Sequence, residues 1–143
     1  MIDSMLLVDD EDLFHLVFED ACSLLDITLS LRGIKTTDET EKLFQSWRTD
    51  PTGRPDCVFV DLNIIGSTVD GIELIRRINF EYGNGVVIGI ISSSNEPKEQ
   101  ARAIQAGAQF WIIKSDEIEP RLEEFKKDYP EYQKRTAPFK VYK

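Results

Sequence analysis

The chain has 143 residues, of which 41% are hydrophobic and 30% are charged, the composition of one globular domain. Its net charge of −9 argues against nucleic-acid binding, which needs a basic surface. No apolar run approaches the roughly 20 residues that cross a bilayer, and the acidic N-terminus lacks the features of a signal peptide. We therefore expect a cytoplasmic protein that binds neither nucleic acid nor membrane.

Apolar runs of strand length alternate along the chain with amphipathic stretches of helix length. The predicted strands are Met5–Val8, Ile27–Leu31, Cys57–Val60, Val86–Ile91 and Phe110–Ile113. The predicted helices lie at 12–25, at 38–47, after Gly71, from Pro97 to Gly107, and at 118–129. This alternation is typical of an α/β fold, a doubly wound five-stranded parallel sheet with helices on both faces. Residues 1–130 are expected to form this domain, and 131–143 are predicted to be a basic C-terminal tail with no output domain attached.

The two cysteines, Cys22 and Cys57, lie in apolar stretches and outside any CxxC motif. This favours two buried thiols over a disulfide or a redox pair. The single histidine, His15, has no cysteine or histidine close to it in the sequence, so we do not expect a zinc site.

Several of the predicted strands end at a polar or charged residue. Asp9 and Asp10 follow the first strand, Asp61 the third, Ser92 the fourth and Lys114 the fifth. Because the carboxyl ends of parallel strands share one edge of an open sheet, these side chains should meet there. Three carboxylates at one place need a cation, and Mg²⁺ suits a site of oxygen ligands that also takes phosphate. With an ammonium and a hydroxyl beside them, the set suits transfer of a phosphoryl group to a carboxylate.

Each of these residues also has a purely structural interpretation. The acidic pair after the first strand could cap the helix that follows it. The serine run at 92–94 could consist of turn and cap residues, and Trp111 could equally belong to the core. The expected meeting of Asp61 and Lys114 at one edge favours the site over these alternatives.

Four segments carry a family resemblance. They are Val8-Asp9-Asp10-Glu11, Val60-Asp61-Leu62-Asn63, Ile91-Ser92-Ser93 and Ala106-Gly107-Ala108 through Ile113-Lys114. In their order and spacing, over residues 4–129, the chain resembles the receiver domains of two-component response regulators, which have the flavodoxin-like fold of CheY-like proteins. It departs from the family in Ser115, where proline is common, and in a longer loop at 64–70.

The resemblance implies a role for each matched position. The implied phosphoacceptor is Asp61. The implied Mg²⁺ ligands are Asp9, Asp10, Asp61 and the backbone carbonyl of Asn63. The residues implied to bind the phosphoryl group or to switch with it are Ser92, Lys114 and Trp111. The residues implied to tune dephosphorylation are Asn63 and Ser94.

The leading hypothesis is therefore a phosphorylation-dependent signalling switch in a two-component system or phosphorelay. A histidine kinase or phosphotransfer protein would donate the phosphoryl group to Asp61. The surface formed by the helix after Ser94, the strand Phe110–Ile113 and the last helix would then bind an unknown downstream target protein. The resemblance implies a monomer or a weak homodimer.

Two other functions are weighed against this one. The first is a constitutive, non-phosphorylated interaction domain on the same fold, which the longer loop at 64–70 motivates. The second is a metal-dependent phosphohydrolase, which usually needs a second acid near the nucleophile. Because Asn63 stands two residues after Asp61 and no cap domain is present, we expect only self-phosphotransfer and slow self-dephosphorylation, not an enzyme.

Overall fold

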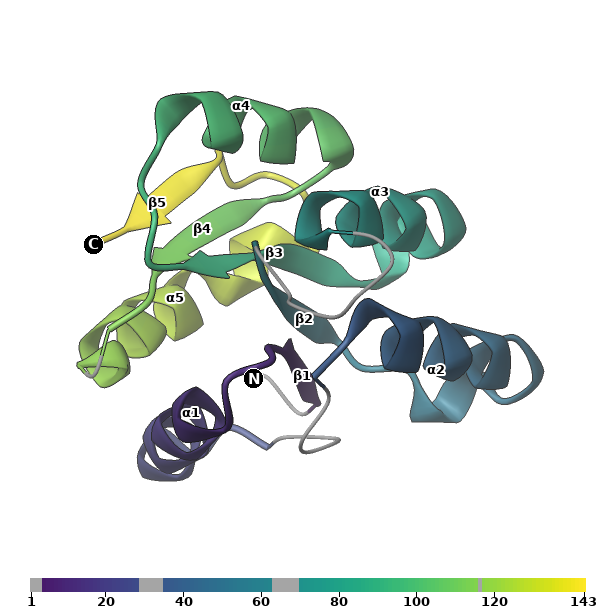
Figure 1. The fold of residues 1–143 in the computed structure, drawn as a ribbon, viewed down its shortest axis with the longest axis horizontal. Coiled ribbons are helices and arrows are strands. Elements are labelled where there is room, and N and C mark those ends of the chain that lie inside the picture. Colours follow the sequence, from purple (N-terminus) through teal and green to yellow (C-terminus); the bar gives the residue numbers. More distant parts are fainter. Residues whose placement is uncertain (1–3, 29–34, 63–69, 116) are drawn as a thin grey trace.

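The computed structural model describes residues 4–28, 35–62, 70–115 and 117–143, and in it five parallel strands form one sheet in the order β1-β2-β3-β4-β5. The strands are β1 (Met5–Val8), β2 (Cys57–Asp61), β3 (Val87–Ser92), β4 (Phe110–Ile113) and β5 (Lys140–Tyr142). The helices are α1 (Asp12–Leu24), α2 (Thr37–Thr49), α3 (Gly71–Tyr82), α4 (Pro97–Ala106) and α5 (Ile118–Gln133), with 3₁₀ turns at Pro51–Gly53 and Gly83–Gly85. The predicted alternating α/β fold is confirmed (Figure 1).

Four of the five strands that the structure describes, β1 to β4, lie where strands were predicted, whereas β5 does not. The predicted strand Ile27–Leu31 is described only at its first two residues, where the Met5 amide donates to the Thr28 carbonyl at 3.0 Å. The fifth observed strand, β5, lies in the segment that was predicted to be a tail. It pairs in parallel with β4, and Trp111 stands opposite Val141 in the register.

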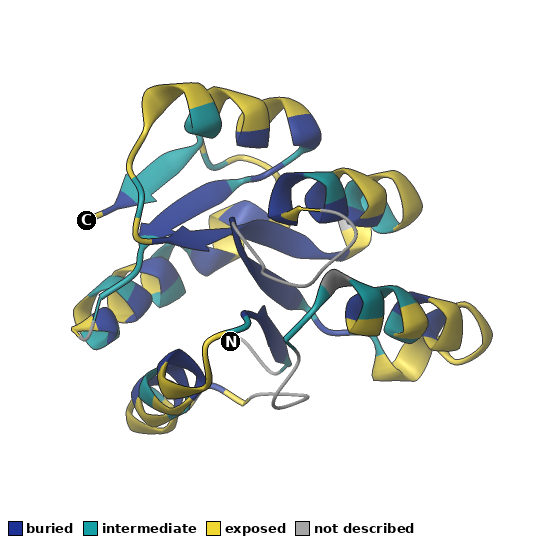
Figure 2. Ribbon diagram, in the orientation of Figure 1, coloured by how far each residue is buried: buried dark blue, intermediate teal, exposed yellow. Residues whose placement is uncertain are grey.

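The sheet separates two apolar layers because side chains alternate along each buried strand. In β2, Cys57 and Phe59 belong to the layer under α1 and α5, whereas Val58 and Val60 belong to the layer under α2, α3 and α4. Figure 2 shows the consequence: β1 to β4 are almost wholly buried, β5 is only partly buried, and each helix is exposed on its outer side. Among the described residues, no helix is long and apolar enough to cross a membrane.

Several helix ends are fixed by local hydrogen bonds. The side chain of Thr36 accepts from the Glu39 amide at 3.1 Å at the start of α2, and Asp70 caps α3 by accepting from the Glu73 amide at 2.8 Å. Such caps satisfy amide groups that have no partner within the helix. At the other end of α4, Gly107 adopts the left-handed conformation, with φ of 110°, which glycine reaches without strain.

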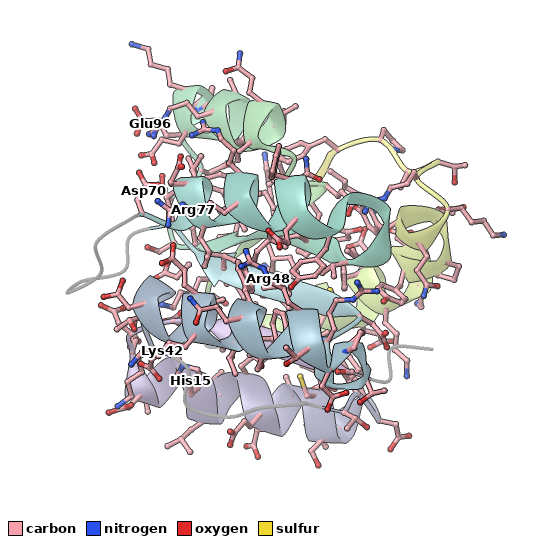
Figure 3. The ribbon with its side chains drawn as sticks, turned by 90° about the vertical axis from the view of Figure 1, so that its right-hand side faces the viewer. His15, Lys42, Arg48, Asp70, Arg77 and Glu96 are labelled. Atoms are coloured by element: carbon pink, nitrogen blue, oxygen red, sulfur yellow. The ribbon has the colours of Figure 1, made fainter. Side chains whose placement is uncertain are left out.

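The neighbouring helices α2 and α3 are linked by ion pairs. Arg48 donates to both carboxylate oxygens of Glu81, at 2.7 and 3.1 Å, and Arg77 pairs with Glu41. Figure 3 shows Arg48 in the space between the two helices. These pairs lie at the surface, where solvent screens them, so each contributes little to stability. They connect side chains of the two helices that face each other.

The last helix, α5, runs past Pro130 and ends at Gln133, further than its apolar spacing predicts. The proline removes one backbone donor from the helix. Two buried aromatic residues hold the last turn in place: Tyr129 and Tyr132 are both 1% exposed, and Tyr132 stacks on Phe125 with ring centroids 5.5 Å apart. The tertiary contacts of the last turn therefore outweigh the local effect of the proline.

Candidate functional site

Three carboxylates meet at the carboxyl ends of β1 and β2, as the sequence predicts. One oxygen from each of Asp9, Asp10 and Asp61 lies within 4.8 Å of the others. Asp9 is fully buried and Asp61 is 9% exposed. The backbone of the following residues orients Asp9, because the Glu11 amide donates to its Oδ1 at 2.8 Å. The result is a compact acidic cluster at one edge of the sheet.

Lys114, at the end of β4, supplies the positive charge for this cluster. Its Nζ lies 2.9 Å from Asp9 Oδ2 and 3.1 Å from Glu11 Oε2. The same ammonium stands 4.6 Å from the centroid of the Phe14 ring. Burial by itself lowers the pKa of Lys114, but the bond to Asp9 and the charges of Asp61 and Asp9 outweigh it and raise the pKa overall. The lysine therefore stays charged inside the site.

The single ammonium of Lys114 does not neutralise all three carboxylates, and the pKa of Asp61 is raised as a result of its burial and of the remaining negative charge. Burial, and next the charge of Asp9, raise the pKa of Asp61 from 3.8 to about 7, although Lys114 acts in the opposite direction. Gly71 allows α3 to start directly against the backbone of Asp61. A Cβ at position 71 would collide with the Asp61 carbonyl oxygen, so the close approach requires glycine.

The residues present fit a Mg²⁺ ion. An octahedral ion with ligands at 2.0–2.1 Å spaces its oxygens about 3–4 Å apart, and it commonly keeps several waters. The three oxygens within 4.8 Å match such an ion after a small inward movement, or with water in place of one carboxylate. The pKa of Asp61, raised first by burial and next by the charge of Asp9, is a second observation that a cation at this place would be favourable.

The hydroxyl of Ser92 lies at the end of β3 and is almost buried, at 3% exposed. Its Oγ accepts from the Ser94 amide at 3.1 Å. The carbonyl of Ser94 in turn accepts from the indole Nε1 of Trp111 at 3.0 Å. Trp111 is thus a core residue, as one interpretation of the sequence had it, and it is also bonded directly to the loop that carries Ser94.

Three residues contribute to this region without having been predicted to do so from the sequence. Glu11 pairs with Lys114, the Nε2 atom of His15 lies 2.7 Å from the Asp9 carbonyl oxygen, and Gly71 lies against Asp61. The position of Glu11 directly after the acidic pair was an available signal, whereas the contact of His15 depends on the packing of α1. Asn63, predicted as a metal ligand through its carbonyl and as a tuning residue, lies outside the described residues.

Comparison with known proteins agrees with the fold and with the family resemblance seen in the sequence. The family model described as response regulator receiver domain matches residues 5–123. Curated protein sequences give no match. Among solved structures, NtrX from Brucella abortus has a TM-score of 0.76 at 23% identity, and the match covers 94% of this chain but only 28% of NtrX.

Two smaller proteins match over nearly their whole length. The Mn²⁺-bound form of response regulator Rcp1 has a TM-score of 0.69 at 15% identity, covering 88% of this chain and 91% of that one. The chemotaxis response regulator CheY4 of Vibrio cholerae has a TM-score of 0.70 at 15% identity, covering 89% and 98%. Likenesses at these identities show the fold, and the family model adds the relationship. Receiver domains serve phosphorylation-dependent signalling in two-component systems, and the chain belongs to the response regulator receiver domain family.

Proposed function

We propose that Asp61 accepts a phosphoryl group from the phosphohistidine of a kinase or phosphotransfer protein, with Mg²⁺ bound, and that the protein signals by contact with a downstream target. The observation that carries this proposal is the cluster of three carboxylate oxygens within 4.8 Å of one another. Three carboxylates beside the single ammonium of Lys114 leave negative charge uncompensated at a partly buried place, which costs free energy. A bound cation and a phosphoryl group would give these carboxylates a functional reason to lie together.

The transfer follows from the groups present. A carboxylate oxygen of Asp61 attacks phosphorus in line with the P–N bond of the donor, a P–O bond forms, and the imidazole leaves with the electron pair of the broken bond. Bound Mg²⁺ supplies charge neutralisation for the phosphoryl oxygens. Lys114 and the hydroxyl of Ser92 provide a positive charge and a hydrogen bond for the same oxygens.

The surface of α1 next to this cluster suits a protein donor. Leu13 and Leu16 are 64% and 62% exposed, and their spacing of three places them on one face of the helix. Because α1 begins at Asp12, two residues after the acidic pair, a partner helix packed on this face would bring its histidine close to Asp61. The two free buried thiols, Cys22 and Cys57, fit a reducing compartment such as the cytoplasm.

The test is an intact-mass spectrum after incubation with Mg²⁺ and a small phosphodonor. Acetyl phosphate and phosphoramidate, whose P–N bond resembles that of phosphohistidine, are used in parallel, with Asp61→Asn as the control. A single phosphoryl adduct on the parent protein and none on the variant is the expected result. No adduct from either donor, under conditions that modify a known receiver domain, would favour the constitutive interaction domain instead.

A further inference from the structure

The C-terminal strand β5 covers the edge of the sheet that β4 would otherwise expose. It lies between α4 and α5 (Figure 1), and Phe110, Trp111 and Ile112 stand opposite its residues 140–142. The family model ends at residue 123, so this strand lies outside the part of the chain that the model matches. An uncovered edge of β4 would present unpaired backbone groups to a partner.

The strand is attached through both of its faces. On the α5 side, Tyr142 is 1% exposed, and its hydroxyl lies 2.8 Å from the Tyr132 hydroxyl and donates to Asp128 Oδ2 at 2.7 Å. Lys140 adds ion pairs to Asp128 at 3.0 Å and to Glu124 at 2.7 Å.

On the opposite side of the sheet, Phe139 and Val141 pack against the apolar layer that contains Trp111. Val141 also stands opposite Trp111 in the sheet register, so a movement of Trp111 would disturb a direct neighbour of β5.

Trp111 also connects the strand to the acidic site. The Ser92 hydroxyl accepts from the Ser94 amide, and the Ser94 carbonyl accepts from the Trp111 indole, at 3.1 and 3.0 Å. If the Ser92 hydroxyl turns to a phosphoryl oxygen on Asp61, the Ser94 amide loses its acceptor and the loop is free to shift. The buried indole then loses its own acceptor, which a fully buried donor does not tolerate without rearrangement.

We propose that β5 is a strap whose attachment to β4 reports the state of Asp61: it is held in the unmodified protein and loosened when Asp61 is phosphorylated. This inference rests on the proposed phosphorylation of Asp61 and adds to it the element that changes. Loosening the strap uncovers the edge of β4 between α4 and α5 only in the modified state. The C-terminal segment is thereby a regulatory part of the fold.

The test is hydrogen exchange followed by mass spectrometry on the full chain in Mg²⁺, with and without acetyl phosphate. The phosphorylated fraction is measured by intact mass in the same samples. We expect the peptide covering residues 134–143 to exchange about tenfold faster in the adduct, within the range of ordinary coupling between sites. Full adduct with unchanged exchange overturns the strap alone. Absence of adduct with both acetyl phosphate and phosphoramidate, where a known receiver domain is modified, overturns the proposed function together with it.

A reciprocal measurement uses a residue that does not contact the site. Tyr142→Phe removes the hydroxyl that bonds Tyr132 and Asp128 and so weakens the strap. Because coupling is reciprocal, the variant should bind beryllium fluoride, a non-covalent phosphoryl mimic, several-fold more tightly in a calorimetric titration with Mg²⁺. The matched control is Lys143→Ala, an exposed change at the next position. Equal affinity in Tyr142→Phe and the control refutes the coupling.

Discussion

The raised pKa of Asp61 predicts that this residue destabilises the metal-free protein at neutral pH. Its pKa is about 7 in the folded protein against 3.8 for an unperturbed carboxyl, and each pKa unit corresponds to about 1.4 kcal/mol. Between these two values the unfolded chain has released the proton while the folded chain keeps it. Stability therefore falls as pH rises from about 4 to about 7, by at most about 4 kcal/mol.

Asp61→Asn removes this dependence because the amide does not ionise. The free energy of unfolding, measured by urea titration in EDTA, should favour the variant increasingly as pH rises. From the same two pKa values, its advantage over the parent protein should grow by about 2–3 kcal/mol between pH 5 and pH 7.5. Saturating Mg²⁺ at pH 7.5 should then stabilise the parent protein more than the variant.

The pH dependence of the difference is the informative quantity, because any packing effect of the amide is nearly constant with pH. If the stabilities of the two proteins change in parallel from pH 5 to pH 7.5, Asp61 does not have the raised pKa inferred from its burial and from the charge of Asp9. If Mg²⁺ stabilises both proteins equally, Asp61 is not part of the cation site.

Three further predictions follow from named contacts. The affinity for Mg²⁺, followed by tryptophan fluorescence, should rise about tenfold from pH 6 to pH 8, because Asp61 with its pKa of about 7 must lose its proton to bind the ion; a flat profile contradicts this. Lys114→Met should cost about 3 kcal/mol of unfolding free energy without Mg²⁺ and less with it, since it leaves buried Asp9 unpaired; Lys127→Met, which breaks only an exposed pair, is the control. Gly89→Ala should lower the free energy of unfolding by about 1–3 kcal/mol, because the added Cβ would lie 2.6 Å from the Phe110 ring. The control is Gly53→Ala, whose added Cβ has no contact closer than 3.7 Å. Equal melting temperatures for the two variants would show that β3 and β4 adjust freely.

The meeting of Asp9, Asp61 and Lys114 could be predicted because it depends on topology. Each residue ends an apolar run, and parallel strands bring their carboxyl ends to one edge whatever the lengths of the helices between them. The roles of these residues stay predictions, since proximity does not demonstrate chemistry. The contact of His15 with the Asp9 carbonyl could not be predicted, because it depends on how one turn of α1 packs against the end of β1.

The strand β5 escaped prediction for a different physical reason. Lys140–Tyr142 is only three residues long and follows Pro138, so neither periodicity nor length marks it as a strand. It forms because Tyr142 is buried against residues of α5 and because Lys140 pairs with Asp128 and Glu124. Such contacts join residues that a local pattern does not connect, and they override the weak propensity of the segment.

The two unusual features of the protein, the strained acidic cluster and the added strand, have complementary energetic consequences. Asp61 retains a high pKa in the metal-free protein, so a cation or a phosphoryl group bound to positive partners relieves an existing cost. The strand at the opposite end of the hydrogen-bonded chain from Ser92 through Ser94 to Trp111 is attached by a few specific bonds. A change of a few kcal/mol in the free energy of the site is comparable with what those hydrogen bonds contribute to stability. A short, specifically bonded strand is therefore suited to respond to the site, which a longer and more deeply packed strand would not do.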